Sequence, residues 1–172
     1  RGEVACLDIE GQRNGNDGPY LDEGRHMVPS DSEPLEVTAI DADIVWLFDI
    51  PNQAGTWPHD GAHGSILIDG DFLYVNTSNG VDNTHRVIRR PEGPSLICLD
   101  KKTGRLLARD REGIGPRIFH STWSSPAMGV VDGRKLIFFC GGDGVVYAFE
   151  PLDSSWRGRP ALASRGHLGL AC

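Results

Sequence analysis

Short runs of apolar residues recur along the chain, each about five residues long and bounded by glycine, asparagine, aspartate or proline. Runs of this length between turn residues predict β-strands. No stretch keeps the helical spacing of apolar residues over three turns. The expected strands are residues 44–49, 64–68, 72–76, 96–100, 105–109, 125–130, 135–140 and 145–150.

These strands form two copies of one four-strand unit, Ile44–Leu99 and Leu106–Phe149. Gly70 and Gly133 open matching strand pairs in the two copies, and a third trace of the unit begins the chain, where EVACLDIEG resembles SLICLDKKTG. The first copy is longer because about fourteen extra residues, Val81–Pro94, follow its third strand. Repeats of roughly 40 to 50 residues that contain several short strands are typical of β-propeller blades.

Several strands are apolar on both faces, as LICL and LIFFC show. A sheet that faces solvent on one side does not accept that pattern, whereas a blade packed between two neighbours does. We therefore expect an all-β fold, a partial β-propeller of four-stranded antiparallel blades with about two blades plus a strand of a third. Its expected partners are the remaining blades of the same propeller or other protein subunits.

Four phrases of the sequence carry a family resemblance: VWLFD, LYVNTSNG, LICLDKKTGRLLARD and DGVVYAFE. They resemble the PQQ-like (pyrroloquinoline quinone) propeller repeat, and the fuller phrasing is similar to the large PQQ-binding-like repeat proteins of planctomycete-type bacteria. The repeat's closing motif is matched by Leu99, Asp100, Thr103 and Gly104, whereas Ala108 replaces its final Trp. The resemblance covers about residues 2–152.

The resemblance implies a WD40-like propeller architecture, export to the periplasm, and a blade-docking role for Trp46. It does not imply the cofactor, because the name of the repeat describes a blade and fold does not settle function. We divide the chain into a propeller segment, residues 1–152, and an irregular tail, residues 153–172. The tail shows neither the alternation of apolar and polar residues typical of strands nor the glycine-containing turns that bound the strands of a blade. It is either a linker or a chain end that does not belong to the repeat.

The net charge and the length of the apolar runs limit the kinds of partner that the chain is expected to bind. The chain has 17 basic and 24 acidic residues, a net charge of −7, which argues against sequence-independent nucleic-acid binding. No apolar run approaches the roughly 18 residues of a membrane span.

Cys6 and Cys98 occupy equivalent strand sites in successive units. Such sites are farther apart than the roughly 7 Å between Cα atoms that a disulfide tolerates. We therefore expect Cys6, Cys98 and Cys140 to be buried thiols.

Two histidines, His59 and His120, stand at about the same place in the two units, a few residues before a strand. In the resembled fold that strand lines the central channel. The residues close by in the sequence are Asp60, His63 and Trp123. Two or more histidines with a carboxylate can bind Zn, Fe or Cu. The alternative is structural, with each histidine bonded to backbone and fixing the inner turn of its blade.

Two loops hold further candidate ligands. In the loop 14–23, Asn16, Asp17 and Asp22 are candidate calcium ligands. The loop does not fit the EF-hand register, and its residue types are also those of ordinary turns.

The insertion Val81–Pro94 carries His85 and the arginines Arg86, Arg89 and Arg90. Such a cluster can bind a carboxylate or phosphate of a ligand or partner, or it is a solvated loop. The pairs Asn79-Gly80 and Asp143-Gly144 predict hairpin turns.

Three functions stay open. The favoured one is a non-catalytic propeller scaffold or binding module, a segment of a larger PQQ-like repeat protein, because the sequence contains no compact catalytic motif. The second is a fragment of a quinoprotein-type oxidoreductase that binds PQQ and calcium, although such enzymes usually show adjacent cysteines and this sequence has none. The third is a histidine-ligated metal or redox site in the channel. No catalytic residue is assigned, and no cofactor is expected outright.

Overall fold

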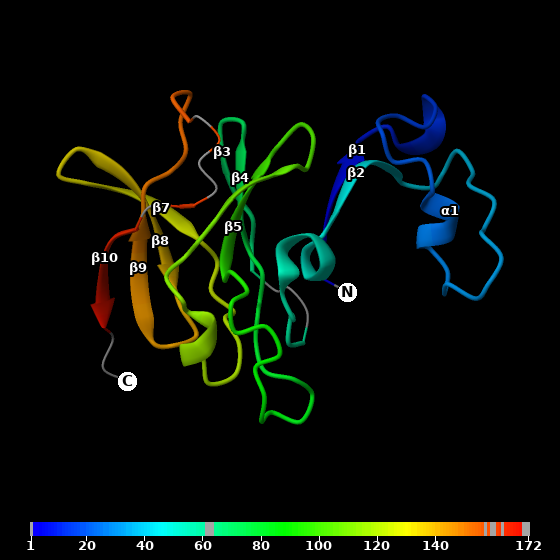
Figure 1. Cartoon of the computed structure of the whole chain (residues 1–172). Helices are drawn as coiled ribbons and strands as arrows, with labels where there is room; N and C mark the ends of the chain where they lie inside the picture. Colours follow the sequence, from blue (N-terminus) through cyan, green and yellow to red (C-terminus); the bar gives the residue numbers. More distant parts are fainter. Residues whose placement is uncertain (1, 61–63, 157, 159–160, 163, 170–172) are drawn as a thin grey trace. The chain divides into compact units, whose positions relative to one another are not determined.

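The computed structural model describes residues 2–60, 64–156, 158, 161–162 and 164–169 (Figure 1). The chain divides into two compact units, one of Glu3–Phe48 and one of Arg1–Gly2 with Asp49–Cys172. Among the described residues, no helix has the length and apolar character needed to cross a membrane.

The smaller unit is built around a two-stranded sheet. Strand β1 (Glu3–Asp8) pairs with β2 (Asp43–Asp49), and the connection between them contains the 3-10 turn η1 (Gly11–Arg13) and the single helical turn α1 (Glu23–His26). Trp46 on β2 is buried. Its burial agrees with the expected docking role, but the blade against which it docks stays a prediction.

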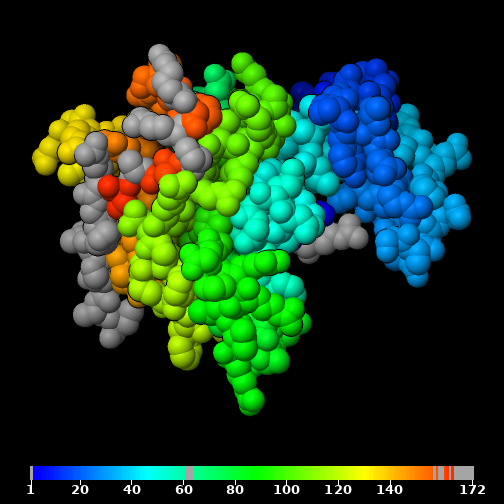
Figure 2. Space-filling view, in the orientation of Figure 1, coloured from blue at the N-terminus to red at the C-terminus, as the bar shows by residue number. Residues whose placement is uncertain are grey.

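The first four-stranded sheet of the larger unit follows the π-helical turn η2 (Ile50–Gly55). Its strands are β3 (Leu67–Asp69), β4 (Phe72–Asn76), β5 (Leu96–Asp100) and β6 (Leu106–Arg109), each antiparallel to the next along the chain. The insertion between β4 and β5 projects beyond the strands in the space-filling view, where it is coloured green (Figure 2).

The turn between β5 and β6 explains the phrase LDKKTG. Asp100 Oδ1 accepts hydrogen bonds from the backbone N–H of Lys102 and of Thr103, both at 2.9 Å, and from the Thr103 hydroxyl at 3.0 Å. Gly104 then takes a positive φ of 68°, which only glycine adopts without strain. These bonds hold the pKa of Asp100 below its usual value against the opposing effect of desolvation.

The second four-stranded sheet follows the 3-10 turn η3 (Gly115–Arg117). Its strands are β7 (Ala127–Val131), β8 (Arg134–Cys140), β9 (Val145–Phe149) and β10 (Ser164–Gly169), again in antiparallel order along the chain. Strand β10 lies in the tail 153–172, for which the sequence predicts an irregular structure, so that prediction is wrong over 164–169. Its residues lack the apolar run that marks the other strands, and pairing with β9 forms it.

The structural blades are shifted by one strand from the units of the sequence repeat. The sequence grouped Ile44–Leu99, but strand β2 pairs with β1 in a separate sheet, and β6 completes the first blade by pairing with β5. The expected grouping is therefore wrong by one strand, because strands near each boundary are similarly apolar and only long-range pairing decides which sheet they join.

One apolar core joins the two four-stranded sheets. Its buried members are Tyr74, Leu96, Cys98, Leu107, Ala108, Ile114, Ile118, Ile137, Phe139, Tyr147, Phe149 and Leu162. On β8, Ile137 and Phe139 face this core, whereas Phe138 lies on the opposite face of the sheet because side chains alternate along a strand. The blade thus packs through one face on its neighbour, and its other face is apolar as well, as the sequence pattern indicated.

The three described cysteines are free, but they differ in burial. Cys98 is fully buried, Cys6 is half-buried, and Cys140 is exposed. The expectation of three buried thiols is therefore wrong for Cys140, which ends β8 on the outer face of the sheet. Burial raises the pKa of the Cys98 thiol to about 12.

Because alkylation requires the thiolate, we expect iodoacetamide to label Cys140 rapidly in the native chain and to leave Cys98 unlabelled until urea unfolds it. Peptide mapping by mass spectrometry after timed quenching measures both rates. Cys140→Ser is the control for assignment of the fast site. Equal labelling of the two thiols in native buffer would contradict the burial of Cys98.

Candidate metal centre

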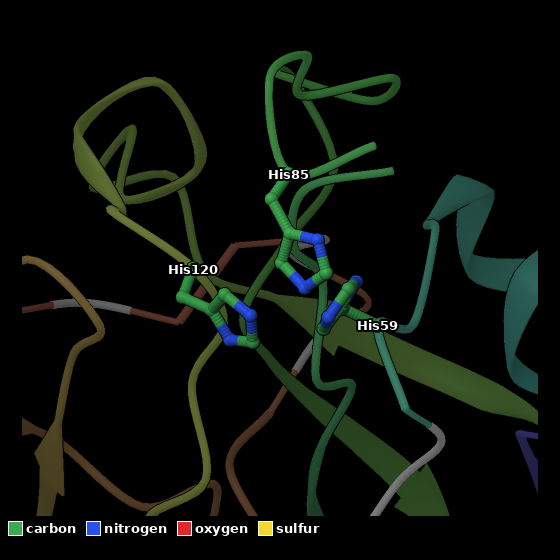
Figure 3. Close-up of side chains that lie close together, drawn as sticks. All are labelled: His59, His85 and His120. Atoms are coloured by element: carbon green, nitrogen blue, oxygen red, sulfur yellow. The ribbon is translucent and has the colours of Figure 1, made fainter. Parts of the chain in front are cut away.

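Three histidine rings from three different loops meet in the larger unit (Figure 3). His59 precedes β3, His120 precedes β7, and His85 comes from the insertion. The ring centroids are 4.3 Å apart for His59 and His120, 4.7 Å for His59 and His85, and 4.8 Å for His85 and His120. One ring nitrogen from each histidine lies within 4.8 Å of the other two.

The segment after β4 holds the two loops that carry His59 and His120. The backbone N–H of His59 donates to the carbonyl of Ser78 at 3.1 Å, and the N–H of Val81 donates to the carbonyl of His120 at 2.9 Å. Gly80 lies between them, where an added Cβ would stand 2.6 Å from the His120 carbonyl oxygen and 2.8 Å from the His59 Cβ. The close approach of the two histidines therefore depends on a residue without a side chain at position 80.

The hydrogen bonds of His59 define which of its nitrogens can bind a metal. Nδ1 lies 2.8 Å from the Val81 carbonyl oxygen. A carbonyl only accepts, so Nδ1 carries the proton and donates, and Nε2 of the neutral ring presents a lone pair. His59 is only 4% exposed, and its Nε2 has no hydrogen-bond partner. Nδ1 of His120 is also buried without a partner.

The turn at the tip of the insertion presents His85. Asp82 Oδ1 accepts from the N–H and hydroxyl of Thr84 and from the N–H of Arg86, and the Asp82 carbonyl accepts from the N–H of His85. The hydrogen bond from the Thr84 hydroxyl is the main cause that lowers the pKa of Asp82. His85 is exposed, in contrast to His59.

Strained backbone surrounds the three rings. Among the described residues, four other than glycine have a positive φ, and three of these are Asp60 at 60°, Ser78 at 53° and His85 at 57°. Left-handed conformations at non-glycine residues are uncommon and concentrate at functional sites. Ser78 also holds the rings in place, since its carbonyl accepts from His59 N–H and from the Ser121 hydroxyl.

The donor set fits a transition metal. Two nitrogens bound to one tetrahedral zinc ion, each at about 2.1 Å, are about 3.4 Å apart. The three nitrogens lie within 4.8 Å of one another, which is close to the spacing that a shared ion requires. The bond from His59 Nδ1 to the Val81 carbonyl is the outer contact that orients metal-bound imidazoles in proteins.

The structure brings together some of the expected site residues. His59 and His120 meet as the sequence indicated, Trp123 lies with its ring centroid 5.0 Å from that of His120, and Asp60 Oδ2 lies 3.4 Å from His59 Nε2. His63 lies outside the described residues. The sequence indicates His85 only as part of the basic insertion. The second unit has no counterpart of this loop, so the spacing of His85 along the chain does not place it beside the other two histidines.

The three arginines of the insertion have separate contacts. Arg86 is exposed beside His85, whereas the Arg89 guanidinium stacks over the Trp57 ring at 4.3 Å and lies 4.0 Å from Asp82. The Arg90 carbonyl accepts from the side chain of Asn79 at 2.8 Å. A shared ligand of all three arginines stays a prediction.

The two pairs expected to form hairpin turns behave differently. Asn79 is buried, accepts from Trp57 N–H through Oδ1, and donates through Nδ2 to Arg90 and Gly93, so it anchors the base of the insertion. The hairpin expectation is therefore wrong for Asn79-Gly80, since β5 begins only at Leu96. It is confirmed for Asp143-Gly144, which connects β8 to β9.

The candidate calcium loop lies in the smaller unit. Asn16 donates to Glu23 at 2.9 Å, Asp17 Oδ2 accepts from Asn14 at 3.0 Å, and Asp22 precedes α1. Over the described part of the chain, the only group of three or more histidine, cysteine or acidic side chains placed to share an ion is the histidine cluster. Calcium binding by Asn16, Asp17 and Asp22 stays a prediction.

The chain contains two consecutive four-stranded antiparallel sheets that pack face to face, and a third sheet is present in part. This arrangement defines the class of the protein as a segment of a β-propeller, and the expected fold class is confirmed.

No family model matches the chain, and no curated protein matches it. Among solved structures, the chain is similar to the quinohemoprotein alcohol dehydrogenase from Comamonas testosteroni, with 19% identity and a TM-score of 0.49. The alignment covers 78% of this chain and 24% of the dehydrogenase chain, so this chain spans about a quarter of that protein.

Proposed function

We propose that this chain is a non-catalytic binding module within a larger propeller and that its ligand is a transition metal ion held by His59, His85 and His120. The observation that carries the proposal is the pair of buried ring nitrogens, His59 Nε2 and His120 Nδ1, that lack hydrogen-bond partners inside a cluster of three imidazoles.

A bound ion accounts for the energetics of this cluster. A buried polar atom without a partner costs about 1 to 3 kcal/mol, and here two such atoms stand in adjacent rings. The lone pair of His59 Nε2 also lies 3.4 Å from an Asp60 carboxylate oxygen, which places two electron-rich atoms side by side. A cation between the rings satisfies both nitrogens and offsets the carboxylate charge, whereas protonation of His59 alone leaves His120 unpaired.

The donor type indicates which ions the cluster prefers. Neutral imidazole nitrogen suits Zn²⁺, Cu²⁺, Ni²⁺ and Co²⁺, whereas Ca²⁺ and Mg²⁺ prefer oxygen ligands. The hydrogen bond from Nδ1 to the Val81 carbonyl fixes the tautomer of His59 so that Nε2 presents its lone pair to the ion.

Titration of the purified, metal-free chain with zinc chloride in a calorimeter tests the proposal. We expect one equivalent of zinc to bind, and His85→Ala to weaken binding by at least about 100-fold, or about 2.7 kcal/mol, because a three-nitrogen site becomes a two-nitrogen site. His85 is exposed, so this variant keeps the core, and circular dichroism checks its fold. His26→Ala, in the smaller unit, is the matched control. Equal zinc affinity in all three proteins, or no binding at all, would refute the metal centre.

The wider setting is part of the proposal. We infer that the partners are further blades of the same propeller and that the protein is exported to the periplasm, as the sequence resemblance implies. The oxidoreductase alternative, with PQQ and calcium, is tested by the visible absorption of the purified protein, because a bound quinone is coloured and zinc is not.

A further inference from the structure

We propose that the metal ion at His59, His85 and His120 keeps one coordination position open to solvent and that this position binds a small organic carboxylate. The inference rests on the proposed metal site and adds a ligand to it.

The count of protein ligands is the first argument. Among the described residues, the three histidines are the only histidine, cysteine or acidic side chains whose donor atoms all lie within 4.8 Å of one another. Asp60 Oδ2 lies 3.4 Å from His59 Nε2, but Asp60 is not part of this group of three and its side chain is 59% exposed. Zinc sites with four protein ligands are closed, whereas sites with three bind an exogenous ligand in the fourth position.

The burial of the three rings shows which side of the ion is accessible. His59 is 4% exposed and is bonded to the backbone of Val81, so its side of the ion is closed. His85 is exposed at the tip of the insertion, and Trp123, whose ring lies against His120, is 50% exposed. The open position therefore faces outward between the insertion and Trp123, from where a solute can reach it.

Charge decides which solute binds there. Three neutral imidazoles add no charge to a divalent ion, and the single Asp60 carboxylate nearby offsets only part of its charge, so an anion is preferred over a neutral ligand. Arg86 follows His85 directly and is exposed, and it adds a cation on the same turn. Arginine pairs with carboxylates through two hydrogen bonds, and the half-exposed indole of Trp123 offers an apolar surface for a short carbon chain. These neighbours favour a carboxylate that bears a small apolar group.

Cobalt substitution makes the coordination position visible, because the absorption of Co²⁺ changes with its ligands. The full chain is loaded with one equivalent of Co²⁺ and titrated with sodium propionate at constant ionic strength. We expect a saturable change in the visible spectrum. Arg86→Ala is expected to weaken propionate binding about tenfold without changing Co²⁺ affinity, whereas Arg90→Ala, on the same insertion, leaves both unchanged.

The outcomes separate the two proposals. Failure to bind Co²⁺ overturns the metal site itself. Normal Co²⁺ binding with a spectrum that does not respond to saturating propionate overturns only the open position, and a response that appears in Asp60→Asn identifies Asp60 as the residue that closes it. Equal propionate affinities in Arg86→Ala and Arg90→Ala overturn the part assigned to Arg86.

Discussion

Replacement of Phe149 by alanine is expected to lower the free energy of unfolding by about 3 to 5 kcal/mol, the usual cost of removing a fully buried aromatic ring. Phe149 is 0% exposed, pairs with Ile137 across the strands, and its ring stacks near that of Tyr147 with centroids 6.0 Å apart. It belongs to the core that joins the two four-stranded sheets. Urea denaturation followed by tryptophan fluorescence measures the change.

Phe138→Ala is the matched control, because it removes the same side chain from the opposite face of the same sheet. Phe138 is half-buried and packs near Gly129 rather than in the core between the blades. We expect it to lower the stability by only about 1 kcal/mol. A loss as large as that of Phe149→Ala would show that this second face is covered in solution, and light scattering on the same sample would then reveal an associated chain.

Gly80→Ala is expected to reduce zinc affinity by at least about 100-fold and to lower the stability by about 1 to 3 kcal/mol, as overpacking usually does. The new methyl group would stand 2.6 Å from the carbonyl oxygen of His120 and 2.8 Å from the Cβ of His59. Neither atom can rotate away, since one is backbone and the other is fixed to it. The loops that carry the two histidines must therefore separate, and the ring nitrogens move apart with them.

Gly70→Ala separates this effect from a general loss of stability. Gly70 has a positive φ of 59° and no atom within 4 Å of an added Cβ, so alanine there costs only the backbone strain, about 1 to 2 kcal/mol. We expect its zinc affinity to equal that of the unmodified chain in the calorimeter. If Gly80→Ala also binds zinc normally, the close approach of the loops does not set the geometry of the centre.

The positions of the strands other than β10 followed from local features of the sequence. The expected ranges 72–76 and 96–100 coincide with β4 and β5, and the other six differ from the observed strands by a few residues at most. The turns that separate them are local as well, since the Asp100 carboxylate bonds to residues within three positions of itself. The short range of these interactions is why a single sequence suffices to predict them.

Local features of the sequence predict only part of the histidine centre. His59 and His120 stand at equivalent places in the repeat, so similarity between the units was enough to relate them. His85 has no equivalent, and its position depends on the bonds of Asn79 to the base of the insertion and on the turn capped by Asp82. Nothing in the spacing of these residues along the chain indicates where that loop folds back.

By itself, then, the sequence determined that the chain forms short strands in repeated blades and that two histidines occupy matching places before them. Only the tertiary structure decided that β6 and β10 complete the blades, that β2 leaves the repeat to pair with β1, and that His85 joins His59 and His120. The physical reason is range. Strand periodicity and turn chemistry act over a few residues, whereas sheet pairing and loop placement depend on contacts between residues far apart in the chain, which no local pattern encodes.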